Sequence, residues 1–435
     1  MSVGTSRAAA PPAHWPLGLL ALANLLAAVG GGRVLSAAKG VTGLAVFGSG
    51  SLLALLAGNA LGLGLLLAVR RVSHRRALIG LSLAAILSSV ALLGVLRLST
   101  PPPLVDREGI AVRLGHAPLA GAAAWVFFVG LVGRCALWYA SRSVRSGLAA
   151  AWRPSWLAIA ESAYFLGFIV GLLLGPVAVA GQRGVAGALL LDAILLLVVA
   201  GCDLSQQRMA PAHTRPDPSP PRHTAARDRL AFWRLTAAFG AATLACQVVV
   251  LHVADALAQT GRPTLAGRAD QTVAAFYGGV ALGAAVCAGL RPTLEQEGGA
   301  QLGIALHAAG RVVRVGVAPL VALAGLPTLL GVCGLAPAWP REAAPAWPIG
   351  VGPSLAALGV GAALFEVVVL AILASVRRAG GGLVALAFGI AATTAALGLF
   401  LMLLGGVRMP GWAAIIVSGL ALAAWLLRGD ARAAA

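Results

Sequence analysis

The side chains best placed to do chemistry are ionisable residues within long apolar segments. Arg134, Asp192 and Glu366 each lie near the middle of such a segment. If these segments cross a membrane, a charge there is costly and marks a functional site by default. Two interpretations stay open: a set of charges facing a central cavity, or a static ion pair that fixes helix packing. In the first, moving the arginine away from a carboxylate lets that carboxylate take up a proton.

Uncharged polar residues also interrupt the apolar segments. Asn24, Asn59 and Tyr277 would either line a polar path for a solute or make interhelical hydrogen bonds, each worth about 0.6–2 kcal/mol. His252 and Asp255 are three residues apart and therefore share a helix face. Because they lie toward the end of their segment, we expect a hydrated pair there rather than a metal site. No metal or cofactor is expected.

The composition is that of a membrane protein. The chain has 435 residues, of which 59% are hydrophobic and 11% charged, and its mean hydropathy is +0.91. Soluble domains carry about 25% charged residues. The net charge of +18 comes from short loops between apolar runs rather than from a basic folded module, so nucleic-acid binding is not expected.

Motifs of common enzyme and metal sites are absent from the sequence. It contains no GxxxxGK[ST], GxSxG or HExxH pattern. The five cysteines form no CxxC pair, which argues against a zinc site or a disulfide framework. We therefore do not expect an enzyme.

Apolar runs near 20 residues are needed to cross about 30 Å of hydrocarbon. The sequence predicts twelve such runs, hence an all-α polytopic membrane protein: Pro16–Leu35, Leu44–Val69, Ala77–Leu96, Leu119–Tyr139, Trp156–Val179, Val185–Cys202, Leu230–Ala256, Val273–Leu290, Val315–Leu335, Val351–Val376, Leu383–Leu404 and Trp412–Leu427.

The basic residues predict the orientation. With both termini in the cytoplasm, the inner segments hold roughly twice as many basic residues as the outer ones. The inner set includes Arg70 and Arg71 after the second run, and Arg142 and Arg145 after the fourth. A bacterial cytoplasmic membrane is the expected location, with the lipid bilayer as the surrounding partner.

A polar stretch from Asp203 to Arg229 is rich in proline and arginine and cannot build a core. We expect two six-helix halves, residues 1–203 and 230–435, joined by a flexible cytoplasmic linker at 204–229. The halves share a short match: Gly58-Asn-Ala-Leu-Gly62 in the second run and Gly279-Val-Ala-Leu-Gly283 in the eighth. Repeated halves are common in secondary transporters.

Glycines mark the expected helix contacts. Gly167, Gly171 and Gly175 recur every four residues in the fifth run and are followed by Pro176. Such a stripe lets the backbones of two membrane helices approach closely. We expect it to pack on the eighth run, near Gly279 and Gly283, as an interface that moves.

Together these features resemble the major facilitator superfamily. The resemblance rests on the twelve runs in two halves, the glycine–proline pattern of the fifth run, Arg134 in the fourth, and the short basic segment Arg70 to Arg76. It implies a secondary active transporter that moves a small solute by alternating access, with proton coupling, and the fifth-run pattern is similar to that of the family's antiporters. The segment after the second run lacks the family's acidic residue. This favours the alternative, a non-transporting module that serves as a structural or partner subunit of a membrane enzyme system. The intramembrane charges and the glycine contacts favour the transporter, which is the leading hypothesis.

Overall fold

The computed structural model describes residues 15–42, 49–69, 72–99, 117–152, 154–177, 182–207, 232–244, 263–289 and 381–404, and eight positions between 356 and 370. All of these residues are helical except Val72 and Ser73. The predicted runs at 315–335 and 412–427, the segments around Arg70 and Arg71, and the pair His252 and Asp255 lie outside this part of the chain. The number of twelve spans therefore stays a prediction.

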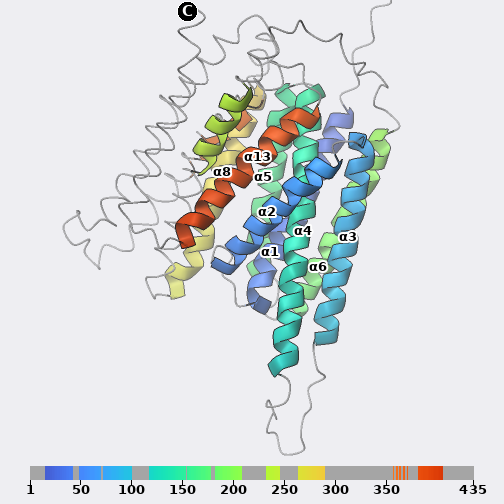
Figure 1. The fold of residues 1–435 in the computed structure, drawn as a ribbon, viewed down its shortest axis with the longest axis vertical. Helices are drawn as coiled ribbons and strands as arrows, with labels where there is room; N and C mark the ends of the chain where they lie inside the picture. The colour runs from blue at the N-terminus through green and yellow to red at the C-terminus, as the bar shows by residue number, and fades with distance from the viewer. Residues whose placement is uncertain are drawn as a thin grey trace, which may run out of the picture.

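In the part of the chain that the structure describes, eight long helices overlap predicted runs, and several extend beyond them (Figure 1). They are α1 (Trp15–Thr42), α2 (Ser49–Val69), α3 (His74–Ser99), α4 (Ala117–Trp152), α5 (Pro154–Val177), α6 (Gln182–Gln207), α8 (Pro263–Gly289) and α13 (Gly381–Leu404). Within the described residues, four segments are long and apolar enough to cross a membrane: Trp15–Ser36, His74–Arg97, Trp156–Leu174 and Gly184–Gln206.

Local sequence sets several helix ends. α5 and α8 begin at Pro154 and Pro263, where the missing N–H costs no helical hydrogen bond. The Ser73 carbonyl accepts the first intrahelical bond of α3 from the Ala77 N–H, at 3.0 Å, and serine is favoured at that N-cap position. α5 ends at Val177, one residue after Pro176, as expected for a residue that cannot continue a helical ladder.

α4 differs most from its prediction. It has 36 residues and continues through Arg142 and Arg145 to Trp152, well beyond the apolar run that ends at Tyr139. Placing those two arginines in a loop was wrong. The reason is that their charges have buried partners on other helices, so the polar segment packs inside the bundle instead of facing water. α6 likewise continues through Asp203, whose side chain is buried, to Gln207.

The described helices pack against one another: α5 contacts α8, and α13 contacts α2 and α4 (Figure 1). α3 and α6 pack together at the opposite edge, where Leu87 and Leu197 are exposed as lipid-facing side chains are. A buried cluster joins α1, α2, α3, α4 and α6; its members include Val34, Ala54 and Phe127.

Glycines allow the closest helix contacts, but not with the predicted partners. A Cβ at Gly167 or Gly171 would overlap the carbonyl oxygens of Leu25 or Val29, so this face of α5 packs on α1. The expected contact with Gly279 and Gly283 was wrong. A different face of α5 meets α8: the side chains of Ser162 and Phe165 contact Ala281 and Tyr277 of that helix. Gly175 lies in helical backbone near the end of α5.

The glycines of the two matching pentapeptides occupy equivalent places. Gly58 and Gly62 of α2 meet the backbone of α4, at the carbonyl oxygens of Val132 and Ala136. The equivalent residues, Gly279 and Gly283 of α8, meet the carbonyl oxygens of Ala356 and Val360. The pentapeptide repeat in the sequence therefore corresponds to a repeated helix contact.

Candidate functional site

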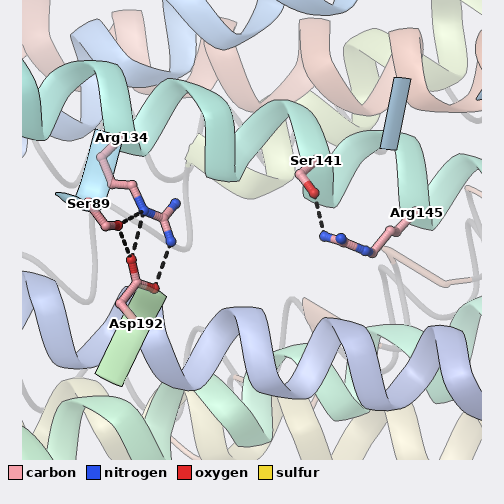
Figure 2. A network of polar contacts seen from close by, with 5 residues as sticks. All are labelled: Ser89, Arg134, Ser141, Arg145 and Asp192. Carbon is pink, nitrogen blue, oxygen red and sulfur yellow. Dashed lines mark hydrogen bonds and ion pairs between the residues drawn. The ribbon is translucent and has the colours of Figure 1, made fainter. Parts of the chain in front are cut away.

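Arg134 and Asp192, two of the predicted residues, lie together. Arg134 of α4 donates from Nε and Nη2 to the Asp192 carboxylate of α6, at 2.9 and 2.7 Å. The Ser89 hydroxyl of α3 donates to the same carboxylate at 2.5 Å and accepts from Arg134 Nε at 3.2 Å (Figure 2). The Arg134 side chain is 3% exposed and that of Asp192 0%, so both charges are buried in this structure.

A second cluster of the same composition lies further along α4. Arg145 Nη2 donates to the Asp203 carboxylate of α6 at 3.0 Å and to the Ser82 hydroxyl of α3 at 3.2 Å. Arg145 also donates to Ser141 on its own helix (Figure 2). Both charged side chains are 1% exposed.

The two clusters repeat at a fixed interval. Arg134 and Arg145 are eleven residues apart on α4, as are Asp192 and Asp203 on α6. Eleven residues complete about three helical turns, so both residues of each helix point the same way. The clusters thus connect α3, α4 and α6 at two heights along these helices. Two such connections would hold the three helices together as a rigid clamp.

Glu366, the third predicted residue, lies apart from Arg134 and pairs with Arg142. The Arg142 Nη2 atom is 2.5 Å from Glu161 Oε2 and 3.8 Å from Glu366 Oε1. Arg142 is 11% and Glu366 15% exposed, more than any charged group in the two clusters. The Ser146 hydroxyl donates to the other Glu161 oxygen at 2.5 Å.

Aromatic rings surround the Arg142 guanidinium. Its Cζ atom lies 4.0 Å from the ring centre of Tyr164, 4.5 Å from that of Phe388 and 4.9 Å from that of Phe165. The predicted site residue Tyr277 of α8 stacks on Phe165 at 5.6 Å. We call Arg142, Glu161, Glu366 and the rings of Tyr164, Phe165 and Phe388 the Arg142 cage.

Other polar residues, including the predicted Asn24 and Asn59, make contacts between helices. Asn24 is buried and donates to the Ala160 carbonyl oxygen of α5 at 3.2 Å. The backbone carbonyl oxygen of Asn59 accepts from the Thr393 hydroxyl of α13 at 3.5 Å. The Tyr139 hydroxyl of α4 donates to the Gly389 carbonyl oxygen of α13 at 2.9 Å. The last two contacts join α13 to the N-terminal helices.

Sequence reasoning missed Arg142, Arg145 and Asp203 as buried partners. Arg142 and Arg145 follow the apolar run that ends at Tyr139, and Asp203 follows the run that ends at Cys202, so all three were placed outside the predicted spans. One signal was available in the sequence: arginines 134 and 145 are eleven residues apart, and so are aspartates 192 and 203.

Comparisons with known proteins identify the fold. No protein-family model matches the chain, and no curated protein matches its sequence. Solved structures do match. The E. coli fucose:proton symporter FucP aligns with a TM-score of 0.58 and 13% identity, over 95% of this chain and 98% of that one. The human organic anion transporter TETRAN aligns at 0.55 and 15%, over 96% and 100%.

A third solved structure carries the family name. The major facilitator superfamily proton:xylose symporter XylE aligns with a TM-score of 0.57 and 12% identity, over 96% of this chain and 95% of the symporter. These alignments span nearly the whole chain, and the apolar helices have the length and composition of membrane spans. The predicted fold is confirmed: the chain is an integral membrane protein with the all-helical fold of the major facilitator superfamily.

Proposed function

We propose that this protein is a secondary active transporter that moves a small solute across a membrane by alternating access. The observation that carries the proposal is the ion pair between Arg142 and Glu366. It joins α4 to the segment 356–370, that is, one predicted six-helix half to the other. The pair is long and partly exposed, so it can break without stranding a fully buried charge.

The repeated helix contact supports a role for this pair in motion. The carbonyl oxygens of Val132 and Ala136 face α2 as those of Ala356 and Val360 face α8. Arg142 lies six residues after Ala136, and Glu366 lies six residues after Val360. Equivalent positions of two repeats thus carry opposite charges and face each other, which is the arrangement expected of a contact between two halves that rock.

The remaining contacts between the halves are also suited to separation. They include the hydrogen bond from Tyr139 of α4 to α13 and the one from Thr393 of α13 to α2. The Ser162 hydroxyl of α5 also donates to the Ala281 carbonyl oxygen of α8, at 2.9 Å. Among the described residues, few polar bonds between the halves would need to break. The predicted orientation has both termini and the linker 204–229 in the cytoplasm of a bacterium. Arg142 then lies closer to the cytoplasm than Arg134 does, so these contacts would form an inner gate.

Proton coupling is part of the proposal, with a changed partner. We assign the proton-carrying role to Glu366, which faces Arg142 rather than Arg134. Withdrawal of Arg142 on opening would favour protonation of a buried carboxylate. The glycine–proline pattern of α5 favours exchange of the solute against protons, that is, antiport.

The test is uptake into proteoliposomes from a solute panel under an imposed proton gradient, with wild type and Glu366→Gln. We expect the variant to keep solute exchange and lose pH-driven accumulation. A disulfide between Ser162→Cys and Ala281→Cys should block uptake reversibly, whereas one within the C-terminal helices, between Gly240→Cys and Thr394→Cys, should not.

The alternative is a non-transporting structural or partner module. The two wholly buried Arg–Asp–Ser clusters favour it, since they make half of the molecule rigid. Absence of uptake for every solute, together with no effect of the Ser162–Ala281 lock on any measured exchange, would support this alternative and refute the transporter proposal.

A further inference from the structure

The Arg142 cage has the chemistry of a cation site. A guanidinium within about 6 Å of an aromatic ring centre gains cation–π energy, and three rings meet that condition around Arg142. Tyr164 and Phe165 come from α5, whereas Phe388 comes from α13. Both predicted halves therefore contribute rings, and the cage would change shape if they moved apart.

The charges of the cage also favour a cation. Two carboxylates, Glu161 and Glu366, face a single guanidinium. With both ionised, the cage carries one negative charge in excess, which repels an anionic solute. A neutral sugar would need many hydrogen-bonding groups, but the cage offers mostly aromatic faces.

Arg142 fills the cage without using all of its hydrogen-bonding capacity. Its Nε atom is buried and has no hydrogen-bond partner among the described residues. Glu366 is held at 3.8 Å, beyond a close ion pair. Arg145 also has a buried Nε atom without a partner among the described residues, but its side chain is 1% exposed, against 11% for that of Arg142. Arg142 is thus the more accessible of the two.

We propose that the Arg142 cage is the recognition site for an organic cation bearing a guanidinium or amino group, and that Arg142 occupies it when no solute is bound. The solute cation takes the place of the Arg142 guanidinium between the rings and the two carboxylates. This inference rests on the proposed transport function, since it names the class of solute that crosses.

The binding test uses propylguanidinium, which is the arginine side chain in free form. N-propylurea is its neutral counterpart, and butyrate is an anion of similar size. Binding to the purified full-length protein is measured by calorimetry and by thermal shift. We expect saturable binding of propylguanidinium alone, and at least tenfold tighter binding to Arg142→Ala, because the competing side chain has been removed.

Matched variants separate recognition from simple filling of a hole. Arg145→Ala removes the same side chain from the same helix, but without a ring cage, and should not gain affinity. Tyr164→Leu should weaken binding by about twofold to thirtyfold, the range of a cation–π contact. Tyr164→Leu also decides the matter in the wild-type background if Arg142→Ala does not fold.

The outcomes distinguish this inference from the transport proposal. Equal binding of N-propylurea or butyrate, or an equal gain in Arg145→Ala, would overturn the cation site. Uptake of neutral or anionic solutes without cation binding would leave the transporter standing and refute this inference. Cage-dependent cation binding without uptake of any cation would uphold the site and refute transport.

Discussion

Neutralising Asp192 tests whether the Arg134 cluster is a static clamp. In Asp192→Asn, the Arg134 guanidinium keeps its burial but loses the carboxylate that accepts two of its hydrogen bonds. Removing one partner of a buried ion pair typically costs about 3–5 kcal/mol. At about 1.4 kcal/mol per factor of ten, the folding equilibrium falls by about 150-fold or more.

The assay is thermal unfolding of the purified protein in detergent, followed by tryptophan fluorescence. We expect a lower midpoint for Asp192→Asn, and a similar decrease for Asp203→Asn, since Arg145 is buried in the same way. Replacing Arg134 and Asp192 together by leucine should recover most of the loss, because no charge is then left unpaired.

Two results would refute this reasoning. If Asp192→Asn unfolds like wild type, the pair does not hold the helices together. If the double leucine variant is stable and correctly inserted but loses gradient-driven uptake, Arg134 and Asp192 take part in transport, as the first of the two sequence-based interpretations holds.

Three further changes test the packing and the topology. Gly171→Leu should reduce the folded yield seen in size-exclusion profiles, since overpacking at the contact with α1 costs about 1–3 kcal/mol. Gly187→Leu should not reduce that yield, because open space surrounds this glycine. Tyr139→Phe removes the hydroxyl that bonds to α13 and should lower stability by about 0.5–1.5 kcal/mol in the same unfolding assay; an unchanged midpoint would show that this bond contributes nothing. Cysteine at Ser219 should react with an impermeant reagent only from the cytoplasm and cysteine at Thr100 only from outside, given the bias of basic residues; labelling of both from one side would contradict the twelve-span topology.

The fold was largely predictable because lipid imposes a simple rule: about 20 apolar residues per crossing helix. The runs containing Arg134 and Asp192 were recognised as helices, and a single charge among apolar neighbours identified both residues. The limits of α4 were not predictable in this way. Arg142 and Arg145 lie in a locally polar segment, and only partners distant in sequence allow that segment to be buried.

The candidate site was harder to predict, because pairing is a property of three-dimensional packing. Glu366 was identified from its apolar surroundings, but its neighbour is Arg142 and not Arg134. Likewise, the glycines of α5 indicated a close contact without indicating which helix makes it. A glycine stripe has no side chain that could be complementary to one partner, so its sequence contains no information about the partner's identity.

The polar second half of α4 has a consequence for how the protein is made. Arginines 134 and 145 each precede the aspartate that neutralises them by 58 residues, so each is synthesised first. A nascent chain that ends before α6 therefore has two cations in α4 with no counter-charge, and membrane insertion of such charges is costly.

The order of synthesis then determines when α4 can settle. Both arginines acquire their aspartates from a single helix, α6, so one insertion event neutralises the two charges together. Arg142 receives Glu161 earlier, from α5, and Glu366 only when most of the chain has been translated. Until Glu366 is synthesised, the Glu161–Arg142 pair of the first six helices lacks this second carboxylate. At that stage, a membrane chaperone or protease would meet an incompletely packed molecule.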